Sequence, residues 1–246
     1  MTDAPILLIT GAGRGIGAAT AKLAAARGFD VAVNYLRDET SANAVAGVVR
    51  QQGRRAITVQ GDMGKEADIA RMFASIDNNL GRLTHMVYNA GITGDPSRVE
   101  AADAAMMRNV IEVNVLGALL CAQAAIKRMS KKHGGNGGAM VMISSAAATL
   151  GGPNEYIWYA GTKGAIDSMT IGFSKELADD GIRVNSVQPG LIDTEIHVAG
   201  RVARVSPMIP LQRPGTADEI AESVVFLLSD AARYTTGSIL RVAGGR

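Results

Sequence analysis

Residues 5–20 read PILLITGAGRGIGAAT, and this stretch combines the two patterns that decide the fold. Residues 5–10 form a short apolar run, which is typical of a buried strand. The glycine-rich turn that follows leads directly into a helical pattern. Backbone N–H groups in such a turn, together with the N-terminus of a helix, can hold a pyrophosphate. The stretch therefore predicts a strand, an anion-binding loop and a helix.

The spacing of the glycines distinguishes between two kinds of dinucleotide loop. The common pattern G-x-G-x-x-G does not fit at Gly11, because its third glycine would fall on Ile16. The pattern that fits is Thr10-Gly11-x-x-x-Gly15-x-Gly17. Glycines after a strand mark only a tight turn when they stand alone. Their place after the first strand of an alternating series favours cofactor binding.

Six further short apolar runs follow, separated in most cases by longer helical patterns. They lie at 30–35, 55–60, 84–90, 139–145, 182–188 and 238–244. This alternation predicts an α/β fold, a Rossmann-like doubly wound sheet of seven parallel strands with helices on both faces. Most runs lack polar alternation, as expected for strands covered on both faces. No linker interrupts residues 1–246, so we expect one domain, with 131–139 as a glycine-rich surface loop.

Composition excludes several classes of protein. The 246 residues are 47% hydrophobic and 20% charged with a net charge of +2, which does not indicate a nucleic-acid or membrane surface. The single cysteine, Cys121, excludes a disulfide framework and favours a small core residue. His85 and His133 have no partners at metal-ligand spacing, so we predict no metal. Neither a signal peptide nor an apolar run of about 18 residues is present, which predicts a cytoplasmic protein.

Residues 109–129 differ from the other helical patterns because they are apolar nearly all the way round. A helix that covers one face of a sheet needs a single apolar stripe. A second apolar side must be buried elsewhere, and a second subunit is the most direct cover. We therefore expect a homo-oligomer, either a tetramer or a dimer.

Two tyrosines are candidates for acid–base chemistry, and only one has a lysine one helical turn away. Tyr156 is followed four residues later by Ala160, whereas Tyr159 is followed by Lys163. Lowering a phenol pKa from about 10 to about 7 needs roughly 4 kcal/mol of preference for the phenolate. One positive charge at ~4 Å, with an effective dielectric constant of ~20, supplies about that much. An exposed Tyr/Lys pair is the alternative interpretation.

Five motifs in order make the chain resemble a short-chain dehydrogenase/reductase of about 250 residues. They are TGAGRGIG (10–17), YNAG (88–91, with Tyr88 in place of the family's first Asn), NVLG (114–117), ISS with YAGTK (143–145 and 159–163), and PGLIDT (189–194). The resemblance covers essentially the whole chain. It implies hydride transfer between a nicotinamide cofactor and a carbonyl or alcohol carbon.

The resemblance also implies the roles of four residues. Tyr159 exchanges the proton, Lys163 tunes it and binds the nicotinamide ribose, and the second serine of the pair Ser144–Ser145 holds the substrate oxygen. The gap from Ser145 to Tyr159 is one residue longer than the family's commonest spacing. Asn114 supports a proton relay at a helix distortion; a structural Asn bonding a backbone carbonyl explains its place equally well.

The choice between NAD(H) and NADP(H) depends on the end of the second strand. In proteins that bind NAD(H), a carboxylate at this place normally accepts a hydrogen bond from the 2′-OH of the adenosine ribose. Here Asn34 takes that place, and Arg14 or Arg37 could pair with a 2′-phosphate, although Asp38 would oppose it if turned inward. We predict NADP(H), with NAD(H) possible. The cofactor-binding residues expected are Gly11, Gly13, Arg14, Gly15, Ile16, Gly17, Asn34, Tyr35, Arg37, Asp62, Met63, Asn89, Ala90, Gly91, Tyr159, Lys163, Pro189, Gly190, Ile192 and Thr194.

Residues 190–214 follow the sixth strand and are a candidate substrate lid. Thr194 contacts the nicotinamide carboxamide by resemblance, His197 could contact substrate, and Leu150, Pro153 and Tyr156 line the same pocket. The sequence leaves 3-oxoacyl reduction and sugar or alcohol oxidation open. The basic stretch 127–133 could meet an acidic carrier protein or could be a solvated helix end. The alternative outside the enzymes is a non-catalytic dinucleotide-sensing protein.

Overall fold

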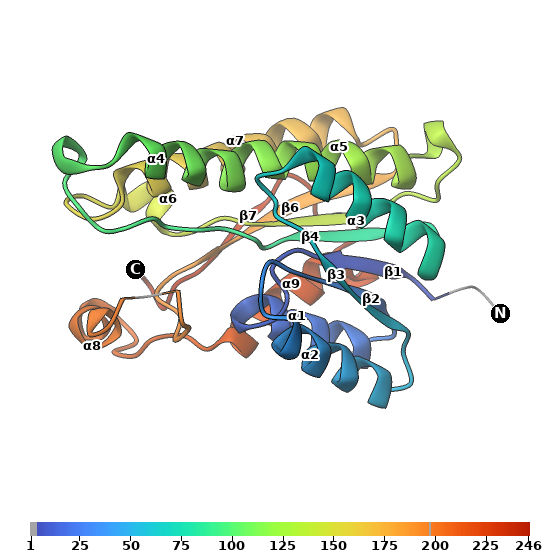
Figure 1. Cartoon of the computed structure of the whole chain (residues 1–246), viewed down its shortest axis with the longest axis horizontal. Coiled ribbons are helices and arrows are strands. Elements are labelled where there is room, and N and C mark those ends of the chain that lie inside the picture. The colour runs from blue at the N-terminus through green and yellow to red at the C-terminus, as the bar shows by residue number, and fades with distance from the viewer. Residues whose placement is uncertain (1–3, 197) are drawn as a thin grey trace.

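Seven parallel strands form one sheet in the computed structural model, which describes residues 4–196 and 198–246 (Figure 1). The strand order is β3-β2-β1-β4-β5-β6-β7, so the order reverses between β1 and β4. This reversal creates the crevice in which doubly wound sheets bind ligands. The strands are β1 (Ile6–Ile9), β2 (Asp30–Tyr35), β3 (Ala56–Gln60), β4 (His85–Tyr88), β5 (Gly138–Ile143), β6 (Ile182–Pro189) and β7 (Ile239–Val242).

The predicted fold class is confirmed, and each of the seven apolar runs contains a strand. The run at 30–35 has the predicted bounds, whereas the others differ by one or two residues at their ends. The loop expected at 131–139 is shorter than predicted, because a 3₁₀ turn occupies Lys131–His133 and β5 already begins at Gly138.

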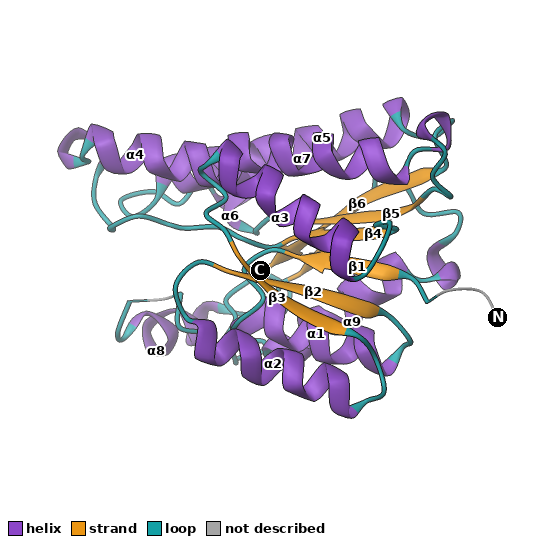
Figure 2. Cartoon of the chain, turned by 45° about the vertical axis from the view of Figure 1, so that its right-hand side comes forward, coloured by secondary structure: helices purple, strands orange, loops and turns teal. Residues whose placement is uncertain are grey.

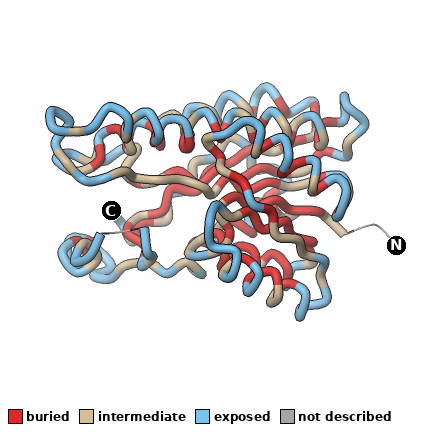
Figure 3. Tube along the Cα trace, viewed as in Figure 1, coloured by how far each residue is buried: buried red, intermediate tan, exposed pale blue. Residues whose placement is uncertain are grey.

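Helices cover both faces of the sheet (Figures 1 and 2). The helices α1 (Gly15–Ala26), α2 (Glu39–Gln51) and α9 (Ala217–Leu228) lie on one face, and α3 (Glu66–Asn79), α4 (Ala104–Ile111), α5 (Gly117–Met129) and α7 (Ile157–Glu176) on the other. A hydrophobic core lies on each face of the sheet, and alternate residues of a strand point into one core or the other. In β1, Leu7 and Ile9 pack with α1, whereas Leu8 packs with α3 and α5. Figure 3 shows the buried strands between exposed outer helix faces.

The helix expected at 109–129 begins earlier and is distorted in its middle. It runs from Ala104 to Met129, with a π-helical segment at Glu112–Leu116 between α4 and α5. By length and composition alone it could cross a membrane, but 44% of its most apolar window is buried inside the protein, as in a core helix. Ile111, Leu116 and Leu119 remain exposed on its outer side.

Short helices occur in two of the connections that follow strands, after β5 and after β6. The helix α6 (Ala147–Leu150) follows β5, and the lid contains α8 (Arg201–Val205) with a 3₁₀ turn at Ser206–Met208. Further 3₁₀ turns occupy Val99–Ala101 and Asp230–Ala232. The lid is anchored by a bridge between Ile192 and Gly215, so its two ends lie together.

Candidate active site

One large cavity gathers nearly all of the predicted site residues. It measures about 1270 Å³ and lies where the carboxyl ends of β1, β2, β4, β5 and β6 meet the lid. Its lining contains the predicted catalytic and cofactor residues with two exceptions, Gly17 and Asn114. Leu150, Pro153 and Tyr156 also line it, as expected. His197 lies outside the described residues.

The glycine loop, residues 10–17, is held by hydrogen bonds with Asn89, which follows β4, as well as by its own turn. Asn89 donates from Nδ2 to the carbonyls of Thr10 and Gly11, both at 2.9 Å. Thr10 Oγ1 in turn accepts the backbone N–H groups of Asn89 and Ala90, both at 2.9 Å. A Cβ on Gly17 would stand 2.6 Å from the Gly11 carbonyl oxygen. Only glycine lets α1 approach the loop this closely, so Gly17 shapes the loop from outside the cavity, whereas Asn89 both holds the loop and lines the cavity.

Ser145 and Tyr159 lie together on the cavity wall. Ser145 follows β5, and its Oγ accepts the N–H of Ala147 at 3.1 Å at the start of α6. Burial raises the pKa of Tyr159, while a hydrogen bond with Ser145 and the charge of Arg201 lower it. The neighbouring Ser144 is buried, and its Oγ donates to the Lys163 carbonyl at 3.0 Å. The structure thus gives the two serines different tasks, with Ser145 beside the phenol.

Lys163 reaches the site from inside the protein. Its side chain is buried, and Nζ donates to the Ile143 carbonyl at 2.7 Å. Burial lowers its pKa to about 8, and the charge of Asp167 opposes that shift. Nζ lies 5.6 Å from the centroid of the Tyr159 ring. Without a cofactor the pKa of Tyr159 is therefore raised, not lowered as the sequence argument expected from Lys163 alone.

Asn114 holds the backbone around the π-helical distortion. Its Oδ1 accepts from Ile92 N at 2.9 Å, and its Nδ2 donates to Ile92 O at 2.9 Å and to Thr162 Oγ1 at 3.1 Å. These contacts support the interpretation of Asn114 as a structural residue, and its part in a proton relay stays a prediction. Tyr88, which departs from the family motif, donates its buried hydroxyl to the Val113 carbonyl inside the same distortion.

Asn34 has a different task from the one expected. Its amide accepts Gly11 N–H at 3.0 Å and donates to the Val59 and Gly61 carbonyls, both at 3.2 Å. The residue is only 2% exposed. These bonds engage both polar atoms of the Asn34 side chain in joining β2 and the residues at the end of β3 to the glycine loop. Leu36 and Arg37, which follow β2, line the cavity beside Asn34.

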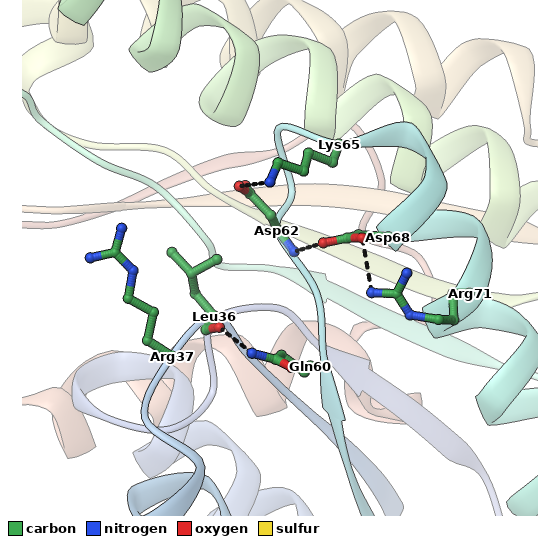
Figure 4. A pocket seen from close by; sticks show the side chains of 7 residues that line it. All are labelled: Leu36, Arg37, Gln60, Asp62, Lys65, Asp68 and Arg71. Carbon is green, nitrogen blue, oxygen red and sulfur yellow. Dashed lines mark hydrogen bonds and ion pairs between the residues drawn. The ribbon is translucent and has the colours of Figure 1, made fainter.

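The two candidate arginines differ in what surrounds them. Arg14 pairs with Glu195 of the lid at 2.7 Å. Arg37 lines both the large cavity and a neighbouring pocket of about 320 Å³ that Asp62 also borders. Figure 4 shows no bond between the Arg37 guanidinium and the other residues drawn, and none of the described residues bonds it. Asp38 also lines the large cavity, but its carboxylate caps α2, where it accepts from Ser41 N at 2.9 Å and from Ser41 Oγ at 2.6 Å.

The lid is docked by a cluster that sequence reasoning missed. Glu155, just before α7, pairs with Arg201 at 3.2 Å and also with Arg204, both on α8. Burial opposes ionisation of Glu155, but the two arginines outweigh it and lower its pKa. The sequence signal for this cluster was the spacing of Arg201 and Arg204, which lie three residues apart in the lid. Their partner lies almost fifty residues away, so spacing could not reveal the pairing.

The basic stretch 127–133 is a helix end at the opposite edge of the sheet. It precedes β5, whereas Ser145 follows that strand. Arg128 pairs with Asp77 at 2.6 Å and Lys132 with Asp180 at 3.2 Å. The stretch therefore does not border the cavity, which favours the interpretation as a solvated helix end.

The residues of the cavity fit a dinucleotide. Gly91 has no side chain where a Cβ would meet Lys163 Nζ at 3.4 Å, which keeps the floor of the crevice open beside that ammonium. The glycine loop opens α1, and its N–H groups suit a pyrophosphate. Arg37 adds to the lining of the same cavity a cation that no residue of the described chain bonds.

Three comparisons with known proteins agree with this geometry. Residues 11–246 match the family model described as enoyl-(acyl carrier protein) reductase. An uncharacterized oxidoreductase of Escherichia coli, YgfF, is 47% identical over 98% of this chain and 99% of its own. A 3-oxoacyl-[acyl-carrier-protein] reductase of Synechocystis is 36% identical (98% and 96%), and an L-rhamnose 1-dehydrogenase (NAD(P)(+)) of Sphingomonas is 35% identical (100% and 97%).

A solved structure carries the same fold with a cofactor. The short chain dehydrogenase of Burkholderia cenocepacia, in complex with NADP, superposes with a TM-score of 0.90 at 32% identity and covers 98% of this chain and 97% of its own. This chain belongs to the short-chain dehydrogenase/reductase family. It is therefore an oxidoreductase of CH–OH and C=O groups. In this short-chain dehydrogenase/reductase the lid and the residues after β2 both line the large cavity.

Proposed function

We propose that the protein is an NADP(H)-preferring carbonyl reductase or alcohol dehydrogenase, built on one domain over residues 1–246. The observation that carries the proposal is the convergence of Ser145, Tyr159 and Lys163 on the cavity that the glycine loop also lines. A binding protein that only senses a dinucleotide needs the loop but not this hydroxyl pair with an ammonium.

The three side chains divide the chemistry of carbonyl reduction. The nicotinamide, when bound, supplies the hydride to the carbonyl carbon. Ser145 donates a hydrogen bond to the carbonyl oxygen as negative charge develops there. Tyr159 delivers the proton to that oxygen, and Lys163 favours the phenolate that remains. In alcohol oxidation the same groups act in reverse order.

Arg37 supports the preference for NADP(H). A guanidinium without a partner beside the cavity suits a 2′-phosphate, and the neutral Asn34 does not repel one. Replacing Arg37 with Gln should weaken NADPH binding about tenfold and leave NADH binding within about twofold. Fluorescence titration of both cofactors measures this, with Arg14→Gln as the matched control. Tighter binding of NADH than of NADPH by the unmodified protein would contradict the preference.

The walls around Ser145 favour a carbonyl compound with an apolar arm over a sugar. Leu150, Tyr156, Ile196, Val205 and Met208 line this side of the cavity. The relatives include both a 3-oxoacyl reductase and a sugar dehydrogenase, so both classes belong in the test. We expect β-keto esters and β-keto thioesters to be reduced faster than aldoses are oxidised, as followed by NADPH absorbance. No turnover across the panel would favour a non-catalytic sensor.

Two further parts of the proposal concern the whole molecule. The exposed apolar residues of α4, α5 and the π-helical segment fit a face covered by a second copy in a dimer or tetramer. The protein works in the cytoplasm. Sedimentation of the purified chain and fractionation of cells that contain it check these two statements.

A further inference from the structure

An arginine that follows the last strand lines the large cavity. Arg246 comes after β7 and belongs to the lining together with Val205 and Met208 of the lid. Its backbone N–H donates to the Ala243 carbonyl at 3.2 Å, but no residue within 4–196 or 198–246 bonds its guanidinium. A guanidinium in a cavity lining that has no protein partner in the described chain is available to a ligand.

The turn that carries Arg246 is fastened to the lid. The Gly244 carbonyl accepts the backbone N–H of Leu211 at 3.1 Å. Both glycines of the turn have a positive φ, 64° at Gly244 and 91° at Gly245, and a Cβ on Gly244 would stand 2.7 Å from Ile209 Cγ2. Only glycine combines this conformation with so close an approach. The two glycines therefore place Arg246 against the lid (Figure 1).

This position lies far from the one proposed for the phosphate of the cofactor. Arg37 follows β2, and five strand-to-strand steps separate β2 from β7 in the sheet. At ~4.8 Å for each step, the separation is about 24 Å. Ser145, in contrast, follows β5, and only β6 lies between β5 and β7. An anion that meets Arg246 is therefore part of the substrate and not the phosphate that Arg37 would bind.

The charges on the α8 side of the cavity also favour an anion. Arg201 and Arg204 of α8 share a single carboxylate, that of Glu155, so these three residues together keep a positive charge. Arg246 adds another guanidinium to the same lining. A positive potential in a cleft with low-dielectric walls raises the local concentration of anionic ligands.

The acids of the lid lie beside the glycine loop. Asp193 and Glu195 both line the cavity, and they flank Thr194. A Cβ on Gly15 would stand 3.4 Å from Thr194 Cγ2, which places this part of the lid against the loop. Glu195 pairs there with Arg14. These carboxylates therefore belong to the loop side of the cavity and do not compensate the charge of the α8 side.

We propose that the substrate carries an anionic group and that Arg246 binds this group while the carbonyl lies at Ser145. The proposal rests on the proposed function, because it takes carbonyl reduction at Ser145 as given. The lining on this side also includes Leu150, Val205 and Met208, which suit an apolar body. The substrate is thus an oxo compound with an apolar body and an anion, which is either its own carboxylate or the phosphate of a thioester carrier.

Pairs of substrates that differ in charge test the proposal. The acids 3-oxobutanoate, 4-oxopentanoate and 5-oxohexanoate are each compared with their methyl esters, and acetoacetyl-CoA is compared with the neutral S-acetoacetyl-N-acetylcysteamine. NADPH absorbance gives kcat/KM for each compound. At least one anionic member should exceed its neutral partner by about tenfold, the effect of one charge-assisted contact. Preference for an acid alone assigns a carboxylate, and preference for the CoA thioester alone assigns a phosphate.

Replacing Arg246 with Gln should remove this preference. KM for the anionic member should rise about tenfold with kcat nearly unchanged, whereas kcat/KM for the neutral member should stay within about twofold. R246K keeps the charge and should retain part of the preference. R233Q, which removes an exposed arginine shortly before β7, is the matched control. Melting temperatures show whether each variant is folded, and R246M is the second uncharged variant.

Three results would overturn the proposal: no preference for any anionic substrate in the unmodified protein, a preference that survives in R246Q, or an equal loss in R233Q. Absence of turnover with every carbonyl compound would instead count against the proposed function. Calorimetric titration of hexanoate into the NADPH-bound protein then decides the role of Arg246. Binding that R246Q abolishes supports that role, and equal binding to both proteins or binding to neither overturns it.

Discussion

The catalytic segment, residues 144–163, and the lid, residues 190–214, face the same cavity but are held in opposite ways. Lys163 is 3% exposed and bonded to the backbone of β5, and Ser144 bonds the backbone of α7. The lid is held in part by ion pairs, which range from the exposed Arg14–Glu195 (side chains 71% and 72% exposed) to the more buried Arg201–Glu155 (19% and 26%). Buried backbone bonds fix geometry, whereas exposed ion pairs contribute little stability and yield to salt.

This difference separates two requirements of one reaction. Proton transfer needs the Ser145 and Tyr159 hydroxyls held within hydrogen-bond distance, which a packed helix and strand provide. Substrate entry and product release need a part that opens, which a few ion pairs permit. On the proposed function, the segment should therefore determine whether reaction occurs, and the lid should determine on which substrate and how fast. Three changes test that division, from the largest expected effect to the smallest.

Replacing Tyr159 with Phe should give the largest effect. The change removes the hydroxyl that we propose exchanges the proton and keeps the ring, so kcat should fall by about 10²- to 10⁴-fold. NADPH affinity and the melting temperature should stay close to those of the unmodified protein. Tyr156→Phe is the matched control, since the same ring three residues earlier should lose only a fewfold. Equal losses of kcat in the two variants would contradict the division of roles between the catalytic segment and the lid.

Replacing Lys163 with Met should change stability with a defined pH dependence. The pKa of Lys163 is about 8 when folded against 10.5 as its ordinary value, so burial of the charge destabilises the native state below pH 8. That cost is about 3 kcal/mol, and it diminishes as pH rises from 8 toward 10.5, where the unfolded chain also loses the proton.

The free energy of unfolding of K163M relative to the unmodified protein should therefore fall by about 2 kcal/mol between pH 7 and pH 10. Urea denaturation at a series of pH values measures it. The lost hydrogen bond to Ile143 lowers the stability of K163M equally at each pH. A pH-independent difference would show that Lys163 is not buried as a charged group.

Replacing Glu155 with Gln should give the smallest effect, because it loosens only the docking of α8. We expect KM to rise by at most about fivefold with kcat nearly unchanged. High salt should have a similar effect on the unmodified protein and little further effect on E155Q. Glu222→Gln, which removes a surface partner of Arg27 on the far helices, is the control. A large loss of kcat in E155Q would mean that the lid holds the catalytic segment in place.

Much of this site could be predicted because its residues lie in local patterns. The seven apolar runs predicted the strands, and the four-residue spacing of Tyr159 and Lys163 placed both on one face of a helix. The glycine spacing predicted a dinucleotide loop. These features follow from short-range geometry, in which the helical and strand periods place neighbours on a common face.

The remaining assignments depended on contacts between distant residues. The sequence could not show that Asn34 holds the glycine loop, because its partners Val59 and Gly61 lie on β3 and just after it. Nor could it separate Arg14 from Arg37, since Glu195 reaches Arg14 from the lid. Glu155 and Arg201 meet only after the lid folds back over the start of α7.

The sequence by itself determined the α/β architecture, the glycine loop and the identities of the tyrosine and lysine, because strand and helix periods and turn chemistry are local properties. Only the tertiary structure decided which serine stands beside the phenol, which arginine pairs with the lid and which carboxylate docks α8. Those outcomes depend on burial and on pairing between segments far apart in the chain, and both arise only when the chain is packed.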